Sequence, residues 1–279
     1  MEKQNCNLFL ISTPIGNIKD ISYRAVEVLK IVDLIFAEDK RVTQKLLNYY
    51  DIRKPLYIYN KDNERENTKK IIDLLLDGKK IALSSDAGCP CISDPGEVLV
   101  KTLLEKKLNF EIIPGPTAFV MALVYSGFDT GSFFFQGFIG HKKNERTSIL
   151  KELQFVKATL IFYESCHRIK ESLYDILNYF EPPIFVCREL TKLFEERIYI
   201  YKRDDIDNII EKGEFAIVVN NIIREIPQDK DSLTFINNLK KAGFTKKDIL
   251  KILISGGFKR NYSYNLIQSA DVYYTEDVH

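Results

Sequence analysis

The chain has 279 residues, of which 45% are hydrophobic and 28% charged, and its formal net charge is +1. This composition excludes a disordered chain and favours a globular protein of two or more domains. No apolar run reaches the roughly 20 residues that cross a bilayer, and residues 1–5 lead into a strand-like run instead of a signal-peptide core. We therefore expect a cytoplasmic protein without a membrane partner.

The first part of the chain alternates short apolar runs with segments of helical periodicity. We predict strands over residues 8–13, 34–37, 56–59, 81–85 and 110–113, and helices over 22–31, 42–49, 68–76 and 98–106. Buried strands separated by amphipathic helices are typical of parallel βαβ units. The run Pro114-Gly115-Pro116 ends this pattern. Residues 1–116 are therefore predicted to form an N-terminal α/β domain with a parallel sheet.

The second part has more strand signal and fewer intervening helices. A helix restarts over residues 117–122, and we predict strands over 133–138, 158–163, 184–188, 196–201 and 215–219. Alternation in period two over residues 195–202 favours antiparallel pairing. Residues 117–226 are therefore predicted to form a second α/β domain with a mixed sheet.

The last part, residues 227–279, loses the strand signal after Ile226-Pro227. Three short helices are predicted there, over residues 232–242, 246–254 and 261–270. We expect a small helical C-terminal domain.

The five cysteines are odd in number and lack paired C-x-x-C spacing, as expected of reduced thiols rather than a disulfide framework. Cys89 and Cys91 are soft metal ligands in type, but their spacing is unusual for zinc and His141 is distant along the chain. We predict no metal site. Since the net charge is close to zero, RNA binding would depend on local basic clusters.

The most informative segment is the run SDAGCPCISDPG at residues 85–96, which follows a buried strand. Ligands of open α/β sheets bind at the carboxyl ends of strands, and small residues there let the backbone approach a ligand closely. Residues 12–17 and 114–118 follow two other strands with similar small-residue turns. Three such loops predict a cleft for a polar ligand, although a single loop of this kind is equally well explained as a turn with capping aspartates.

Seven motifs in chain order carry a family resemblance. They are LISTPIGNIKDIS at residues 10–22, AEDKR at 37–41, SDAGCPCISDPG at 85–96, PGPTA at 114–118, FYESCHR at 162–168, RELTK at 188–192 and GEFAIVV at 213–219. Together they resemble the ribosomal RNA small-subunit methyltransferase I group of the tetrapyrrole methylase superfamily. The resemblance runs from Leu8 to about Val219 and is weaker beyond.

The resemblance implies a two-domain methylase, usually dimeric, that binds S-adenosylmethionine (SAM) between its domains. It also implies methylation of the 2′-hydroxyl of a cytidine in 16S ribosomal RNA, either free or in the assembled small subunit. The cofactor contacts of the superfamily fall on Pro14, Ser84, Asp86, Ala87, Gly88, Cys89, Thr117, Ala118, Tyr163 and Leu190.

The chain departs from the group at a few positions. Cys89, Cys166 and Lys40 stand where the group usually has Thr, and Gly140 stands where it has Pro. Cysteine in place of threonine removes a strong hydroxyl partner, so a side-chain role at position 89 is in doubt.

A ribose hydroxyl is a weak acid, so a carboxylate or imidazole within hydrogen-bond reach would help to remove its proton. Candidates are Glu38 and Asp39, which follow a buried strand, and Glu164 and His167 in the FYESCHR motif. An alternative for Glu38 and Asp39 is an ion pair with Arg41 or an N-cap for the next helix.

Basic residues supply the candidate RNA contacts. Arg41 and Arg168 are predicted clamps for phosphate or carboxylate groups. Lys142 and Lys143, with Arg146, are predicted in a loop, and the tail carries Lys240-Lys241, Lys246-Lys247 and Lys259-Arg260. The simpler interpretation of such lysine runs is a solvated surface.

Three other functions are compatible with parts of the sequence. A methylase of a porphyrinoid or of a protein side chain such as diphthine would keep the cofactor loops without needing a basic tail. A non-catalytic RNA-binding protein would keep the fold but not the loop around Asp86. A helix-turn-helix DNA reader built on the tail would leave both α/β domains unexplained.

Overall fold

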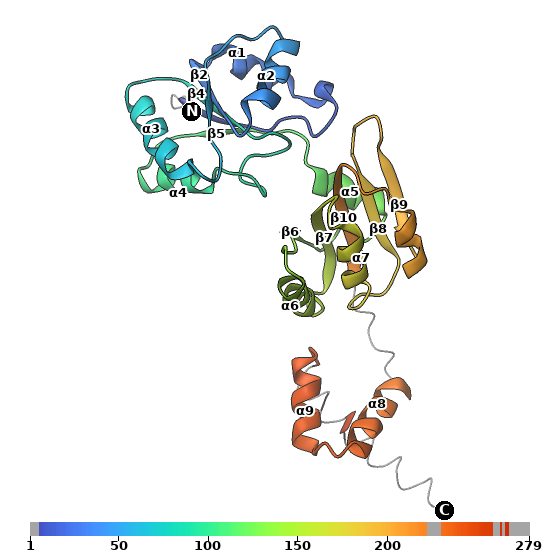
Figure 1. The fold of residues 1–279 in the computed structure, drawn as a ribbon. Coiled ribbons are helices and arrows are strands. Elements are labelled where there is room, and N and C mark those ends of the chain that lie inside the picture. Colours follow the sequence, from blue (N-terminus) through green and yellow to red (C-terminus); the bar gives the residue numbers. More distant parts are fainter. Residues whose placement is uncertain (1–5, 222–229, 259–262, 264–265, 268–279) are drawn as a thin grey trace, which may run out of the picture.

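The computed structural model describes residues 6–221, 230–258, 263 and 266–267. Two five-stranded sheets follow one another along the chain, and a pair of helices follows the second sheet (Figure 1). The α/β fold class predicted from the sequence is therefore confirmed.

The first sheet is wholly parallel, with strand order β3-β2-β4-β1-β5. Its strands are β1 (Leu8–Ile11), β2 (Leu34–Ala37), β3 (Leu56–Ile58), β4 (Ile81–Ser84) and β5 (Glu111–Ile113). The helices are η1 (Ile18–Asp20), α1 (Tyr23–Ile31), α2 (Lys40–Tyr49), α3 (Glu64–Leu76) and α4 (Glu97–Glu105).

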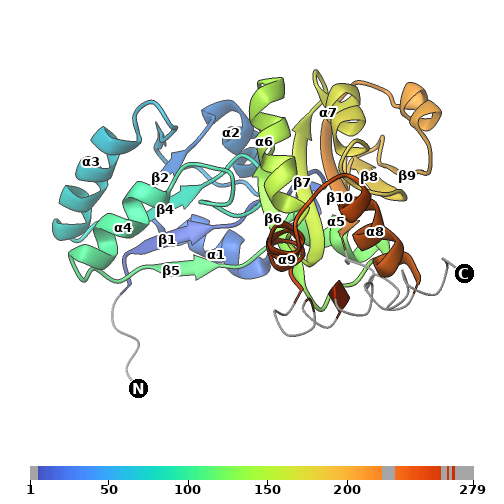
Figure 2. The ribbon, with the colours of Figure 1, turned by 90° about the horizontal axis from the view of Figure 1, so that it is seen from below.

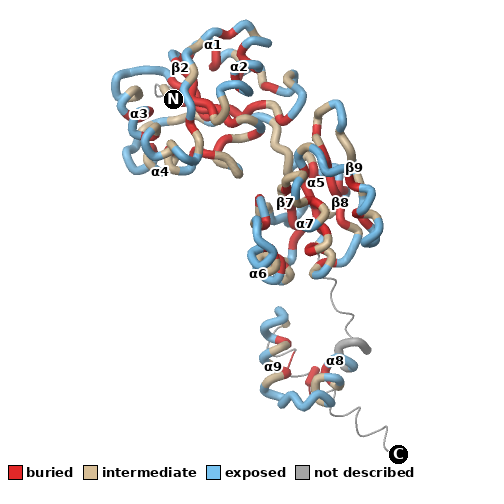
Figure 3. The backbone as a smooth tube through the Cα atoms, in the orientation of Figure 1, coloured by how far each residue is buried: buried red, intermediate tan, exposed pale blue. Residues whose placement is uncertain are grey.

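Both faces of this sheet are covered by helices. One apolar cluster joins side chains of α1 and α2 to one face, and a second cluster joins those of α3 and α4 to the other. Strands β1, β2 and β4 are consequently buried along their whole length (Figure 3). This explains why they read as continuous apolar runs without alternation. All strand carboxyl ends face the same edge, which is where the loops after β1, β4 and β5 lie.

The second sheet is mixed, with strand order β6-β7-β10-β8-β9. It is formed by β6 (Phe133–Phe138), β7 (Ala158–Ser165), β8 (Ile184–Arg188), β9 (Glu196–Ile200) and β10 (Glu214–Asn221). Only the β6–β7 pair is parallel, and the other three pairs are antiparallel, including the predicted antiparallel strand β9. Helix α5 (Ala118–Ser126) covers one face, while α6 (Lys143–Leu153) and α7 (Ile169–Ile176) cover the other; η2 (Arg203–Asn208) also contributes to this second core.

The sequence prediction was wrong about the segment that holds Arg146. This residue lies in α6 rather than in a loop, and its side chain is fully buried. The guanidinium donates to Asp175 of α7 and pairs with Glu171. A buried charge requires such partners. Arg146 therefore ties α6 to α7 and is not exposed for RNA.

The helical tail has α8 (Lys230–Lys241) and α9 (Lys246–Ser255), close to two of the predicted helices. A small apolar cluster that includes Ile236, Ile249 and Leu253 joins them. The third predicted helix, residues 261–270, lies largely outside the described residues, as do Lys259 and Arg260. In Figure 1 the helix pair stands apart from both sheets. The division of the chain at residues 116 and 226 stays a prediction.

Figure 2 shows the first sheet and the second sheet side by side, with α1 to α4 around the first. Among the helices of the described residues, none combines the length and the apolar character that crossing a membrane requires.

Candidate active site

Three loops at the carboxyl edge of the first sheet are in close contact, and hydrogen bonds join the first to the second. Thr13 and Gly88 exchange both of their backbone hydrogen bonds, with N···O distances of 2.8 and 3.0 Å. The Thr13 hydroxyl also donates to the carbonyl of Ser85, at 3.0 Å. A Cβ atom at Gly115 would lie 2.8 Å from the Cβ of Ser12, so only glycine fits where the third loop meets the first. The sequence therefore builds one rigid rim from three separate loops.

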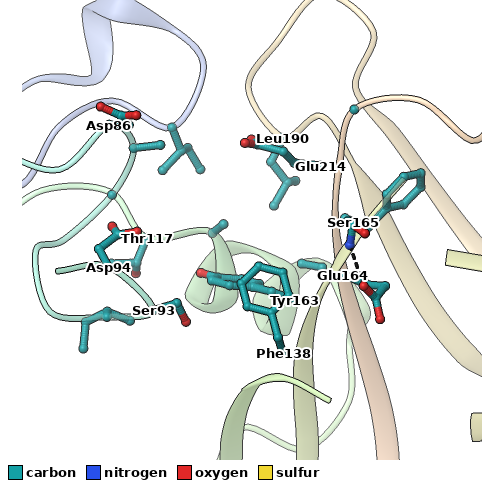
Figure 4. Close-up of a pocket in the computed structure, with 18 of the residues that line it drawn as sticks. Asp86, Ser93, Asp94, Thr117, Phe138, Tyr163, Glu164, Ser165, Leu190 and Glu214 are labelled. Atoms are coloured by element: carbon teal, nitrogen blue, oxygen red, sulfur yellow. Dashed lines mark hydrogen bonds between the residues drawn. The ribbon is translucent and has the colours of Figure 1, made fainter. Parts of the chain in front are cut away.

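A cavity of about 500 Å³ opens between this rim and the second sheet (Figure 4). The first half of the chain lines it with Ile15, Glu38, Asp86, Ala87, Gly88, Cys89, Ile92, Ser93, Asp94, Thr117 and Ala118. The second half contributes Phe138, Tyr163, Glu164, Ser165, Cys166, His167, Cys187, Leu190, Gly213, Glu214, Phe215 and Ala216. The two halves also touch directly, since the Asn17 amide donates to the Thr191 hydroxyl at 2.9 Å.

All of the predicted cofactor residues except Pro14 and Ser84 line this cavity. Ser84 is buried at the end of β4, and Ile15, next to Pro14, lines the cavity in its place. Which of these residues contacts a ligand stays a prediction. The structure shows that residues from all seven motifs line one cavity.

Three carboxylates form an acidic wall on the first-sheet side. Burial raises the pKa of Asp94 to about 7, and the nearby carboxylates of Glu38 and Asp86 add to the rise. Burial also raises the pKa of Glu38, with a contribution from Asp86, and that of Asp86 itself. At neutral pH, Asp94 is consequently divided between its acid and its carboxylate form, as suits a group that exchanges a proton.

Asp94 was missed in the sequence, where the run Asp94-Pro95-Gly96 indicates only a turn. Two residues of the same loop, Cys91 and Ser93, have positive φ angles of 72° and 67°. Such backbone is uncommon for residues other than glycine and is concentrated at ligand sites. These angles fold the loop back, so that Asp94 and Asp86 line the same cavity.

Asp39 has a different environment from Glu38. Its carboxylate caps α2 by accepting the Arg41 amide and also pairs with the Arg41 guanidinium, which lowers its pKa to about 2. It does not line the cavity, nor does Arg41. For Asp39 the structure matches the capping and ion-pair alternative, whereas Glu38 is half-buried in the cavity wall. The Asp39 amide donates to Asp86 at 2.8 Å, so this segment also positions Asp86.

Glu164 lines the cavity, but its carboxylate is engaged in the protein. It accepts hydrogen bonds from the Ser172 hydroxyl, the Ser165 amide and the Arg168 guanidinium. Figure 4 shows the bond from the Ser165 amide. Arg168 bridges in turn to the His141 ring at 3.0 Å. His167 also lines the cavity and is exposed. Of these two predicted groups, His167 is the one whose side chain is open to a substrate.

Lys142 and Lys143 are exposed at the start of α6, where Lys142 is the N-cap residue. They follow β6, whose last residue, Phe138, lines the cavity.

Tyr163 lines the cavity from the second sheet. Its hydroxyl accepts a hydrogen bond from the Phe119 amide at 3.0 Å, and burial raises the pKa of Tyr163 to about 12, so the phenol stays neutral.

Comparison with known proteins gives matches over most of the chain. The model of the family described as Tetrapyrrole (Corrin/Porphyrin) Methylases matches residues 7–207. The chain is 38% identical to the protein named Ribosomal RNA small subunit methyltransferase I of Halalkalibacterium halodurans, over 93% of either chain. It is 44% identical to the protein of the same name from Thermotoga maritima, over 76% of this chain and 97% of that protein.

Among solved structures, a diphthine synthase superposes with a TM-score of 0.63 at 13% identity, over 76% of this chain and 89% of its own. The uroporphyrin-III-C-methyltransferase of Thermus thermophilus superposes with a TM-score of 0.55 at 19% identity, over 77% of this chain and 94% of its own. Identities this low establish the fold alone.

Proposed function

This chain belongs to the tetrapyrrole (corrin/porphyrin) methylases and, within them, to the ribosomal RNA small subunit methyltransferase I group, and from this we propose that it methylates the 2′-hydroxyl of a cytidine in small-subunit ribosomal RNA. Methylases of this family take their methyl group from S-adenosylmethionine, which is therefore the methyl donor here. The observation that carries the proposal is the cavity in which a carboxyl with a pKa near 7, Asp94, shares a wall with the conformationally fixed loop at Gly88.

The cavity fits SAM in size and chemistry. Its volume of about 500 Å³ lies in the range of about 300–1,000 Å³ that is usual for small-molecule sites. The Ser165 hydroxyl, in the cavity wall, is buried and has no hydrogen-bond partner among the described residues, so it can bond a ligand. We propose that SAM is bound by the cavity residues Asp86, Ala87, Gly88, Cys89, Thr117, Ala118, Tyr163 and Leu190. SAM supplies an electrophilic methyl group, so the protein needs no nucleophile of its own.

The chain's own contribution to the chemistry is positioning and proton removal. Holding the hydroxyl in line with the methyl group supplies a large part of the rate, since effective molarities of about 10⁵ M or more are reached by orientation alone. We propose Asp94 as the acceptor of the hydroxyl proton, because its pKa near 7 matches the working pH. Glu38 raises that pKa through its negative charge, and His167 is the alternative acceptor in the same cavity.

The names of the relatives favour ribosomal RNA over the other substrates of the superfamily. Relatives at 38% and 44% identity are named for small-subunit ribosomal RNA, whereas the diphthine synthase shares only 13% of its residues with this chain. Ribosomal RNA as substrate also implies action in the cytoplasm.

The test is to incubate the purified chain with labelled SAM and small ribosomal subunits, or protein-free 16S RNA, from cells that lack it. Label should enter RNA, and the site should resist alkaline cleavage because a methylated 2′-oxygen cannot attack the neighbouring phosphate. Label in a base, or in a porphyrinoid and not in RNA, would contradict the proposal. Comparison of the subunit with free RNA identifies the physical substrate.

We further propose that the chain acts as a homodimer through an apolar surface formed by α5 and β9. Val120, Val124 and Tyr125 of α5 and Tyr199 of β9 are exposed there, although large apolar side chains usually avoid water. The two elements are held together, since the Tyr199 hydroxyl donates to the Ser126 carbonyl at 2.9 Å. Analytical ultracentrifugation of the chain and of Val124→Asp should show a dimer and a monomer; a monomeric parent chain would contradict the proposal.

A further inference from the structure

An exposed aromatic side chain stands in the wall of the methyl-transfer cavity. Phe138, the last residue of β6, is 49% exposed and yet lines the cavity. Its ring centroid lies 6.1 Å from that of Tyr163, at 67°, and Figure 4 shows the two rings beside each other. Ile92, from the loop after β4, is another exposed apolar residue of the same wall. The cavity therefore has apolar surface in contact with solvent, contributed by both halves of the chain.

The backbone of β6 is built to place this ring. The register of β6 against β7 shifts between Phe135 and Gly137, which is a bulge. Gly137 has φ of +74°, and a Cβ there would lie 3.2 Å from the hydroxyl oxygen of Ser93, in the loop that carries Asp94. A bulge redirects the side chain that follows it. The glycine thus brings the strand close to the catalytic loop and turns Phe138 toward the cavity.

Basic side chains continue from this ring along the chain. His141, Lys142 and Lys143 are exposed a short distance after β6, separated from it by Ile139 and Gly140. Arg168, held by Glu164 at 2.8 Å, bridges to the His141 ring at 3.0 Å. An aromatic face next to basic side chains is the combination that binds single-stranded nucleic acid, where bases stack on rings and phosphates pair with basic groups.

We propose that Phe138 stacks on the base of the target nucleotide, which is turned out of the RNA strand, while His141, Lys142, Lys143 and Arg168 hold the adjoining phosphates. Enzymes that modify a nucleotide must bring it out of the base stack into a pocket, where apolar and aromatic side chains replace the lost stacking. This inference rests on the proposed function. It adds a substrate-binding residue and requires that the target nucleotide be unpaired when it reacts.

The experiment compares Phe138→Ala, Phe138→Tyr and the control Phe134→Ala in the full chain. Phe134 is exposed on the same strand but does not line the cavity. Methylation of small subunits from cells lacking the chain is measured together with SAM affinity by calorimetry. We expect Phe138→Ala to lower kcat/KM for RNA about 10- to 100-fold at unchanged SAM affinity, because a stacking surface is lost. Phe134→Ala should stay within about threefold of the parent chain, and Phe138→Tyr, which keeps the stacking ring, should lose far less than Phe138→Ala.

Other results would overturn the inference in distinguishable ways. Full activity of Phe138→Ala would show that the ring does not hold the base. Weaker SAM binding by that variant would assign the ring to the cofactor, and equal losses in Phe138→Tyr or Phe134→Ala would exclude specific stacking. If the parent chain itself binds SAM but methylates no ribosomal RNA, the proposed function fails first.

Discussion

Replacing Asp94 with Asn should inactivate the enzyme and at the same time stabilise its fold at alkaline pH. Burial and the carboxylates of Glu38 and Asp86 raise the pKa of Asp94 from 3.8 to about 7. A pKa change of this size corresponds to a free-energy penalty of about 4 kcal/mol for ionising Asp94 in the folded chain. Because Asp94 is partly exposed, solvent screening reduces the penalty, and we expect a gain of about 1–3 kcal/mol in the free energy of unfolding of the variant.

The sign of the pH dependence follows from the direction of the shift. A carboxyl whose pKa is higher in the folded than in the unfolded chain favours folding below the unfolded value, about 4, and this contribution is lost as pH rises through about 7. The parent chain and Asp94→Asn should therefore be equally stable near pH 4 and should differ at pH 8. Scanning calorimetry at the two pH values measures this, with a rise of about 2–4 °C in Tm per kcal/mol.

The catalytic part of this prediction uses single-turnover methyl transfer at saturating SAM. A general base supplies about 10²–10⁴ in rate, so the Asn variant should lose at least a hundredfold. In the parent chain, kcat/KM should rise with pH through an apparent pKa near 7, and the variant should lack this rise. Asp73→Asn replaces an exposed aspartate of α3 in the same way and is the matched control. It should alter neither the single-turnover rate nor the rise of kcat/KM with pH.

Two results would refute the reasoning. A loss of less than tenfold with the pH rise intact would mean that Asp94 is not the proton acceptor, and His167 would be tested next. A variant with lower stability than the parent chain at pH 8 would mean that the ionised Asp94 is stabilised by its surroundings.

Four other variants test the remaining assignments. Asp86→Ala should weaken SAM binding at least tenfold in calorimetry while the chain stays folded, because its carboxylate fixes the rim loop to the Asp39 amide; unchanged affinity would remove Asp86 from the site. Glu38→Gln should lower the apparent pKa of the rate profile, because a negative charge beside Asp94 is removed. Asp39→Ala should chiefly lower Tm, because the α2 cap is lost. A lower Tm in Glu38→Gln with a shifted rate profile in Asp39→Ala would contradict these assignments. A chain ending at residue 221 should bind SAM normally, because every cavity residue lies before that point. The Thermotoga maritima relative, 97% of which aligns with only 76% of this chain, is correspondingly shorter. The truncated chain should show a higher KM for RNA, and a loss of SAM binding would contradict the prediction.

The sequence predicted the strands better than the helices of the second domain, for a physical reason. Buried parallel strands such as β1 and β4 are short apolar runs that stand out without tertiary information. Helix α6 does not stand out, because its buried positions are Arg146, Leu150 and Leu153. Their spacing is helical, but the first is an arginine, so the apolar stripe is incomplete. Only the carboxylate of Asp175 on α7 makes that arginine a core residue.

The cavity wall was predicted where a motif supplied several of its residues together and was missed where the tertiary fold brings them in. The loops at residues 85–89 and 114–118 were found because each follows a strand of the same parallel sheet. Phe138 gave no signal, since an aromatic residue at a strand end is ordinary until a bulge directs it into a cavity.

The contrast between Glu38 and Asp39 shows how the backbone separates two adjacent carboxylates. Helix α2 begins at Lys40, so Asp39 occupies the N-cap position, and its side chain is turned to the free amide of Arg41. Glu38, one residue earlier, faces the cavity, where burial raises its pKa instead of lowering it. Both residues carry a carboxyl group, and they are the first two residues after β2. The helix start therefore decides which carboxylate caps the helix and which lies with Asp94 in the cavity wall.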